Sequence, residues 1–287
     1  MNLKTYLDLY ALLEANPTSR EENRAFGITH VMIKKKPVQQ LSAWMEAYKS
    51  KLKKPLLSEV FSSYLYTISL SLALIAFFLG LLSGVGLLSY SGKEPVNVIY
   101  FMAMVIAFPL ITMILSLFAM LRANRSRSVL VHVSPAFWME KILGLLPGRI
   151  QEHIRELKMN PLLANWVVIK RSQILALSFS FGLLLALVGA VVTKDIAFAW
   201  STTLQIDPET FYVFLHALAF PWRDFYPSAV PSLELIEQSH YFRLGDQLSG
   251  KMIENAALLG EWWRFLAFST VFYAIILRFV MYLLASI

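Results

Sequence analysis

The sequence predicts an all-α polytopic membrane protein with four transmembrane helices, a small helical cytoplasmic domain and a helical or irregular extracytoplasmic segment. Two observations predict this class. Hydrophobic residues make up 57% of the 287 residues and charged residues only 16%, whereas soluble domains contain about 25% charged residues. In addition, several long runs carry no charge at all, which is the pattern of helices that cross a bilayer.

The uncharged runs place the four spans along the chain. We expect them at residues 60–82, 96–121, 172–193 and 265–285. The glycine-rich stretch from Gly80 to Gly86 should end the first span or let it bend, and Pro109 predicts a kink in the second. The corresponding division of the chain is 1–59, 60–121, 122–171, 172–193, 194–264 and 265–287.

The distribution of Lys and Arg predicts the orientation of these spans. Residues 1–59 hold ten Lys and Arg, and residues 122–171 hold nine. Residues 194–264 hold five Lys and Arg against nine Asp and Glu. Because positive loops stay inside, we expect both termini and residues 122–171 in the cytoplasm. Residues 194–264 should lie on the opposite, outer side. The lipid bilayer is therefore one expected partner of the protein.

The N-terminal part of the chain predicts a helical region with a basic amphipathic helix before the first span. Thr18 and Ser19 each precede a Glu by three residues, so either pair can form a capping box. Further on, Trp44 lies in the middle of an apolar helical face that lysines flank on both sides. Such a helix suits the anionic cytoplasmic leaflet, and the alternative is packing against the protein's own cytoplasmic domain. Topology explains the lysines, so we expect no nucleic acid partner.

The two extramembrane segments farther along the chain are also expected to be helical. Residues 122–171 carry weak helical patterns at 136–146 and 147–157. In the outer segment, Asp207 stands before a proline and a glutamate, which is the order of an N-cap and a first helical turn. A second helix should begin after Ser232. Aromatic belts at membrane surfaces are rich in tryptophan. We expect such interfacial positions for Trp44 on the cytoplasmic side and for four tryptophans on the other side: Trp200, Trp222, Trp262 and Trp263.

The stretch DIAFAWSTTL, from Asp195 to Leu204, follows directly after the third span. Its adjacent hydroxyls, Ser201, Thr202 and Thr203, cannot all face one place on a regular helix. They favour turn or cap chemistry at the end of an aromatic helix at the membrane surface. The alternative is a stretch that dips toward an oligomer axis, where Asp195 and the hydroxyls would ring the mouth of a pore.

Patterns of enzymatic chemistry are missing from the sequence. We find no phosphate-binding glycine loop, no nucleophile elbow and no pair of histidines at metal-binding spacing. The chain also has no cysteine, so thiolate sites and disulfides are excluded. We therefore expect no catalytic residues, no cofactor and no metal.

The second half of the chain resembles a known family. The motif from Asp195 to Leu204, Pro221-Trp222, Ala229-Val230-Pro231 and the Trp262-Trp263 start of a last span with Arg278 are similar to those of a bacterial family of four-span inner-membrane proteins. The resemblance covers most of residues 60–285. It implies a partner, since members are often encoded beside a GTPase-like protein, but it implies no activity.

Two functions remain open from the sequence. The first is a homo-oligomeric channel, gated by the GTPase-like partner, in which Arg278 or the outer hydroxyls line the path. Small residues four apart would bring helices into close contact: Gly80, Gly84, Gly182, Ala186 and Ala190. The second is a non-conducting membrane anchor or scaffold that recruits a cytoplasmic partner. For Arg278 itself, the alternative to a functional charge is snorkelling of its side chain to the inner headgroups.

Overall fold

The computed structural model describes residues 8–9, 12–13, 15–16, 18–29, 36–49, 57–90, 94–123, 161–204, 206–241 and 256–286. The chain divides into two compact units. Met1–Leu70 with Ser126–Asn165 form the first, and Ser71–Arg125 with Trp166–Ile287 form the second. The helices expected at 136–146 and 147–157 lie outside the described residues, as do most of the lysines that flank Trp44.

The first unit contains two short helices, α2 (Arg20–Thr29) and α3 (Pro37–Lys49), and the beginning of the long helix α4 (Leu57–Leu87). Of the two expected capping boxes, the Ser19 pair forms. The Ser19 hydroxyl accepts a hydrogen bond from the Glu22 amide at 3.1 Å, and the Glu22 carboxylate accepts one from the Ser19 amide at 2.7 Å. The Asp8 carboxylate caps the start of α4, where the amide and the hydroxyl of Ser58 donate to it.

Trp44 corrects our expectation for the basic helix. Its side chain is only 7% exposed, and the indole Nε1 donates to the Asn23 side chain of α2 at 2.8 Å. Its ring also stacks on Tyr48 of its own helix, with the centroids 4.8 Å apart. A tryptophan that is paired and buried in this way has no free face for lipid headgroups. Trp44 therefore packs on protein, as in the alternative reading, whereas Val38 on the same apolar side of α3 is 53% exposed.

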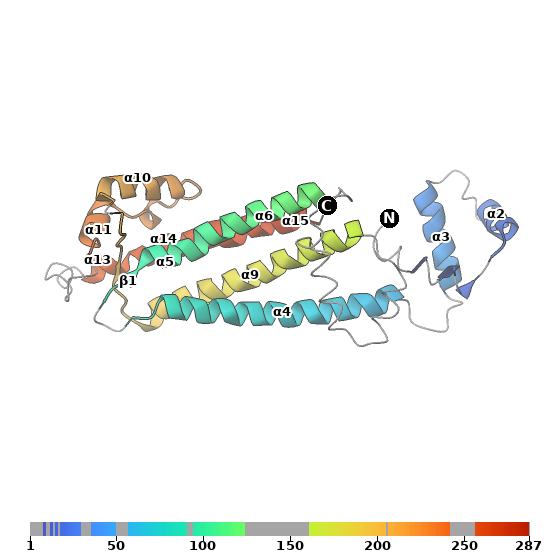
Figure 1. Ribbon diagram of the computed structural model, residues 1–287, viewed down its shortest axis with the longest axis horizontal. Coiled ribbons are helices and arrows are strands. Elements are labelled where there is room, and N and C mark those ends of the chain that lie inside the picture. The colour runs from blue at the N-terminus through green and yellow to red at the C-terminus, as the bar shows by residue number, and fades with distance from the viewer. Residues whose placement is uncertain are drawn as a thin grey trace. The chain divides into compact units, whose positions relative to one another are not determined.

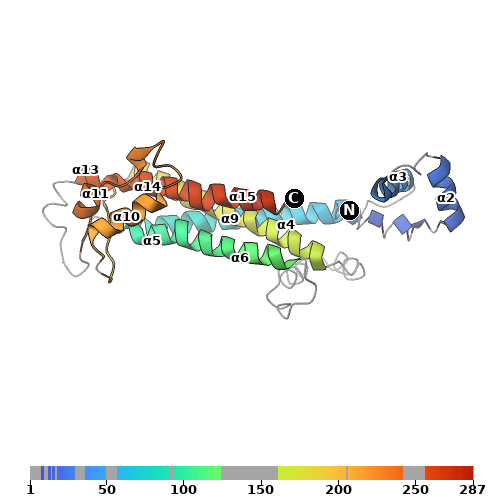
Figure 2. The same cartoon turned by 90° about the horizontal axis from the view of Figure 1, so that it is seen from above.

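The second unit is a bundle of long helices, visible side by side in Figures 1 and 2. It combines the rest of α4 with the following elements in chain order: α5 (Val98–Met102), η2 (Ala103–Ala107), α6 (Phe108–Ala123), α9 (Pro161–Thr193), α13 (Ala256–Gly260), α14 (Trp262–Ser269), η4 (Thr270–Ile276) and α15 (Leu277–Leu284). The elements η2 and η4 are π-helical turns within otherwise α-helical spans.

Within the described residues, four helical stretches are long and apolar enough to cross a membrane: Leu65–Leu87, Val98–Leu121, Trp166–Thr193 and Leu258–Leu284. They correspond to the four expected spans. The first extends beyond its expected end, because α4 continues through Gly80 and Gly84 as far as Leu87. The third and fourth begin earlier than expected, at Trp166 and Leu258. Large apolar side chains cover their outer surfaces, as lipid-facing helices require.

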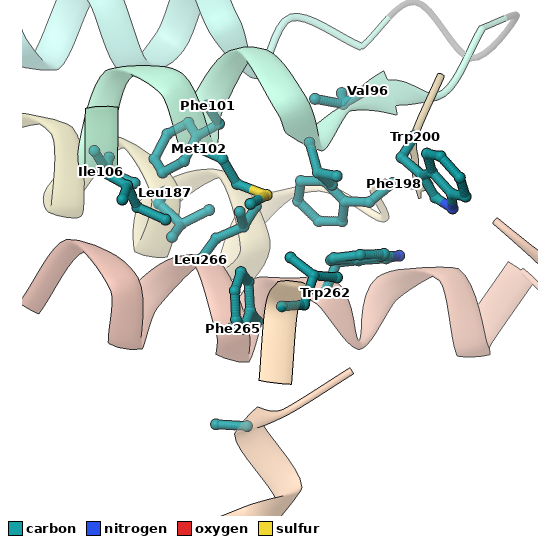
Figure 3. Packing of buried hydrophobic residues seen from close by; sticks show 14 of the residues in the cluster. Val96, Phe101, Met102, Ile106, Leu187, Phe198, Trp200, Trp262, Phe265 and Leu266 are labelled. Atoms are coloured by element: carbon teal, nitrogen blue, oxygen red, sulfur yellow. The ribbon is translucent and has the colours of Figure 1, made fainter. Parts of the chain in front are cut away.

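The core of the bundle lies toward one end. Figure 3 shows Phe101, Met102 and Ile106 of the second span packed with Phe265 and Leu266 of the fourth, and the cluster is extended by residues of the third span and the outer segment. At the other end, Ile169 and Ala285 form a small cluster with Ala119. Successive spans thus run in opposite directions.

A compact segment within residues 194–241, called the outer segment after its expected side of the membrane, caps the end where the core lies. It contains a two-stranded parallel sheet with two residues in each strand, in which β1 (Val96–Asn97) pairs with β2 (Phe198–Ala199). The helix α10 (Pro208–Leu218) starts where expected, since the Asp207 carboxylate accepts a hydrogen bond from the Thr210 amide at 2.8 Å. The 3-10 turn η3 (Pro227–Ala229) follows. Ser232 then caps α11 (Leu233–Gln238), also as expected.

Candidate functional site

Arg278 of α15 lies inside the bundle and is only 4% exposed. Its Nη1 donates to the Gln173 side-chain oxygen of α9 at 3.1 Å. Its Nη2 donates to the Pro109 carbonyl at 3.4 Å and to the Thr112 hydroxyl, both on α6. One guanidinium thus joins three of the four spans. We call Arg278, Gln173, Thr112 and the Pro109 carbonyl the arginine cluster.

The acceptors of the arginine cluster are all neutral. Among the described residues, the ion pairs that form involve other side chains, and no carboxylate compensates Arg278. Gln173 is held in place because its Nε2 donates to the Ser116 hydroxyl at 3.2 Å and to the Ile169 carbonyl at 3.4 Å. The cluster therefore keeps a positive charge in a low-dielectric interior, which is costly and is typical of functional positions in membrane proteins.

Burial of Arg278 bears on one of the two readings of this residue, namely snorkelling. Snorkelling would carry the guanidinium past the end of the span to the headgroups. Instead, the side chain turns inward to the partners on α6 and α9. The snorkelling hypothesis is therefore replaced by an internal position, and whether the charge also acts in transport is a separate question.

Irregular helix geometry lies next to the arginine cluster on two of the three spans that contribute to it, the second and the fourth. In η2 the Phe108 amide donates to the Ala103 carbonyl five residues back, and at the end of η4 the Leu277 amide donates to the Phe272 carbonyl. The turns η2 and η4 pack against each other. Pro109 explains the first, because it has no N–H and crowds the carbonyl four residues before it. π-helical turns occur frequently at functional sites.

The small residues singled out in the sequence form a tight seam between α4 and α9. A Cβ on Gly80 would collide with the Phe179 carbonyl, and one on Gly182 with the Phe77 carbonyl. A Cβ on Gly84 would collide with that of Ala186. The seam lies within one copy of the chain, where close backbone approach supplies the packing. Ala190 is partly buried against the main core.

The stretch DIAFAWSTTL is not a helix but a short strand followed by irregular backbone and a turn. Residues 198–199 form β2, and Trp200 continues the extended backbone by bridging to His240. Asp195 is exposed and Ser201 and Thr202 are half-buried, while Thr203 lies in an exposed turn. The Asn97 side chain ties this stretch to the second span by donating to the Ser201 carbonyl at 3.1 Å. The hydroxyls thus follow β2 in irregular backbone that becomes a turn at Thr203. The turn was expected, but the aromatic helix end was not found.

The tryptophans of the outer segment correct a second expectation. Trp200, Trp222 and Trp262 are completely buried, rather than anchored at a membrane surface. Each indole N–H has a partner inside the protein: the Ile236 carbonyl, the Ala229 carbonyl and the Ser239 hydroxyl. A buried Trp needs such a partner. Trp263 is half-buried, with the Arg264 guanidinium over its ring, so an interfacial position remains a prediction for this residue alone.

Two titratable groups in the outer segment have shifted pKa values. Hydrogen bonds from the backbone and the hydroxyl of Thr210 hold the pKa of Asp207 below its usual range. Burial lowers the pKa of His240, whose ring stacks on Trp200 with the centroids 4.2 Å apart. The fold therefore favours neutral His240, and protonation works against the packing around Trp200.

Sequence reasoning identified Arg278 but missed its partners. Gln173 and Thr112 lie 105 and 166 residues from Arg278 in the chain. The sequence did contain a signal for Gln173. A polar amide at the start of an apolar span indicates a hydrogen-bond partner inside the bundle. Nothing local distinguishes Thr112 or the Pro109 carbonyl.

These features define an α-helical membrane protein with four helices able to span the bilayer, a buried arginine cluster and a packed outer segment. Residues 119–287 match the family described as "Protein of unknown function (DUF2868)". The match covers more than half of the chain, so the chain belongs to this family. No curated protein and no solved structure matches the chain.

Proposed function

We propose that the protein is a non-enzymatic, non-conducting anchor of the bacterial inner membrane that recruits a cytoplasmic partner. The observation that carries the proposal is the closed interior of the bundle. Arg278 joins three spans at one level, and Phe101, Val105, Leu183 and Leu187 fill the adjacent core at 0% exposure. Among the described residues, side chains thus occupy the path that water would need through one copy.

The topology that we propose for the anchor follows the distribution of positive charge. Both termini and residues 122–171 face the cytoplasm, and the partner binds there. The resemblance found in the sequence suggests a GTPase-like protein as this partner. The helices α2 and α3 then form part of the region that is held at the inner surface.

A second candidate function, a homo-oligomeric channel, is favoured by the uncompensated charge of Arg278 and by the π-helical turns beside it. In this case the path runs between copies, or opens when η2 and η4 change their helical register. Gating by the same GTPase-like partner is part of this alternative.

Single-channel recording in planar bilayers separates the two functions. The anchor predicts no unitary currents from the purified full-length protein, and none from Arg278→Leu. Unitary currents whose size or ion preference changes in Arg278→Leu would contradict the anchor and support the channel. The matched control is Leu277→Ala, which alters an exposed neighbour on the same helix.

A second measurement tests recruitment. Inner-membrane vesicles that contain the protein should retain the GTPase-like protein on sedimentation, and vesicles without it should not. Equal sedimentation with both kinds of vesicle would remove the recruiting role.

A further inference from the structure

The segment from Pro208 to Tyr226 runs along the outer part of the fourth span. At its start, the ring of Phe211 lies 6.4 Å from that of Trp262. At its far end, Trp222 stacks on Phe272, with the centroids 5.4 Å apart. The Tyr273 hydroxyl also donates to the Leu218 carbonyl at 2.6 Å. The segment therefore reaches down the span as far as residues 272–273.

This reach places the end of the segment inside the hydrocarbon layer. The fourth stretch, Leu258–Leu284, has 27 residues, or about 40 Å of helix at 1.5 Å per residue. The hydrocarbon core is about 30 Å thick. Even if the core is aligned with the Leu284 end, its opposite edge falls near Phe265. Phe272 then lies about 10 Å inside that edge, and any shift of the core toward Leu258 places Phe272 deeper.

The outward face of the segment has the composition of a lipid-facing surface. Val213 and Phe214 on α10 are 66% and 52% exposed, and Phe220 and Phe225 in the turn after it are 68% and 65% exposed. The inward side is apolar as well, with Phe211 and Leu215 in the core. Helices that are apolar on all sides belong in protein interiors or membranes.

Polarity falls along α10 in the same sense as depth, although Asp224 in the turn after it is 84% exposed. The acidic and hydroxyl residues stand at the start of α10, namely Asp207, Glu209 and Thr210. The exposed residues after them are mainly apolar and aromatic. A helix that enters a membrane with its N-terminus at the surface requires this order.

Several backbone groups at the deep end have partners in the segment or on the fourth span. The amides of Trp222 and Arg223 donate to the Ala219 carbonyl, and the Tyr226 amide donates to the Trp222 carbonyl at 2.8 Å. The Leu218 carbonyl, near the open end of α10, receives the Tyr273 hydroxyl. At membrane depth, the polar groups of irregular backbone must find partners in protein or in a water-filled cavity.

We propose that residues 208–226 form a membrane-inserted element that enters the leaflet on the side of β1 and β2 and presents Val213, Phe214, Phe220 and Phe225 to lipid acyl chains. The charges at its turn are paired, because Arg223 Nε lies 3.5 Å from the Asp224 carboxylate and Arg223 also contacts His216. Charged groups at this depth draw water and headgroups inward. The element thus thins the leaflet locally around its turn.

Spin labels on single cysteines test the insertion directly in the full-length protein in bilayers. The chain has no native cysteine, so Phe214→Cys, Phe220→Cys and Phe225→Cys each carry one label. We expect these labels to relax strongly with oxygen, which concentrates in lipid, and weakly with a water-soluble nickel chelate. Glu209→Cys on the same helix and Glu234→Cys on α11 are exposed controls that should show the opposite preference.

Two results would overturn the proposal. Nickel access at Phe220 and Phe225 equal to that at Glu209 would place the turn in water. Loss of access to both reagents would show that a second protein surface covers the face instead of lipid. Thermal unfolding of each labelled variant, compared with that of the unaltered protein, confirms that the fold is retained, and three independent positions protect the test against one unstable variant.

Discussion

The two ends of the bundle are held together by different chemistry. At the end with the small sheet, neutral groups dominate, and three buried tryptophans each satisfy their N–H inside the protein. Toward the other end, a single guanidinium joins three spans through neutral acceptors. Packing of apolar side chains stabilises the first region. In the second region, hydrogen bonds stabilise a charge that is costly to place inside a membrane. Mutations should therefore act by size at the end with the small sheet and by charge near the arginine cluster.

The largest expected effect is at the outer end. Trp200→Ala removes a completely buried ring and leaves the Ile236 carbonyl without its donor. The free energy of unfolding should fall by about 3–5 kcal/mol, measured by SDS unfolding in mixed micelles. Trp263→Ala is the control, because its half-buried ring should contribute far less. Equal losses in the two variants would contradict the packed outer core.

The glycine seam should show a smaller effect of the same kind. Gly182→Ala places a methyl group against the Phe77 carbonyl, while Gly189→Ala on the same helix meets nothing within 4 Å. Overpacking should cost Gly182→Ala about 1–3 kcal/mol. Gly189→Ala should be neutral or slightly stabilising, because alanine favours helix. A stable Gly182→Ala protein would show that α4 and α9 do not approach so closely.

The smallest expected effect is the pH dependence contributed by His240. Burial lowers the pKa of His240 from its usual value of 6.5, so the unfolded chain binds this proton more readily than the fold does. The stability contribution is complete above pH 6.5 and is lost as the pH falls from there toward the lowered pKa. Replacing His240 with Gln should make the melting temperature depend less on pH in this window. An unchanged slope would exclude His240 as its source.

Local patterns predicted much of the fold. The spans follow from uncharged runs, and the starts of α10 and α11 follow from Asp207 and Ser232, because capping depends on residues three positions apart. The sheet was not predictable, since Val96 pairs with Phe198 across 102 residues through two-residue strands. The prediction of an interfacial position for Trp200 was wrong. A sequence does not distinguish an interfacial Trp from a buried one whose N–H has an acceptor inside the protein.

The site was predictable only in part, for the same physical reason. A charge in an apolar run identifies Arg278, but its partners depend on how three spans are rotated against one another. Pro109 predicted a disturbance in the second span. Its form, a π-helical turn that packs against a second one in η4, depends on tertiary contacts.

A double-mutant cycle on Arg278 and Gln173 tests the central claim, that neutral acceptors within one copy hold the buried guanidinium. Gln173→Leu alone should lower the free energy of unfolding by about 1.5–3 kcal/mol more than it does in the Arg278→Leu background, because it leaves the charge with one acceptor fewer. In that background the guanidinium is gone, and the remaining cost reflects only the bonds of Gln173 to Ser116 and Ile169. Equal costs in the two backgrounds would contradict the arginine cluster and, with it, the closed bundle on which the anchor is proposed.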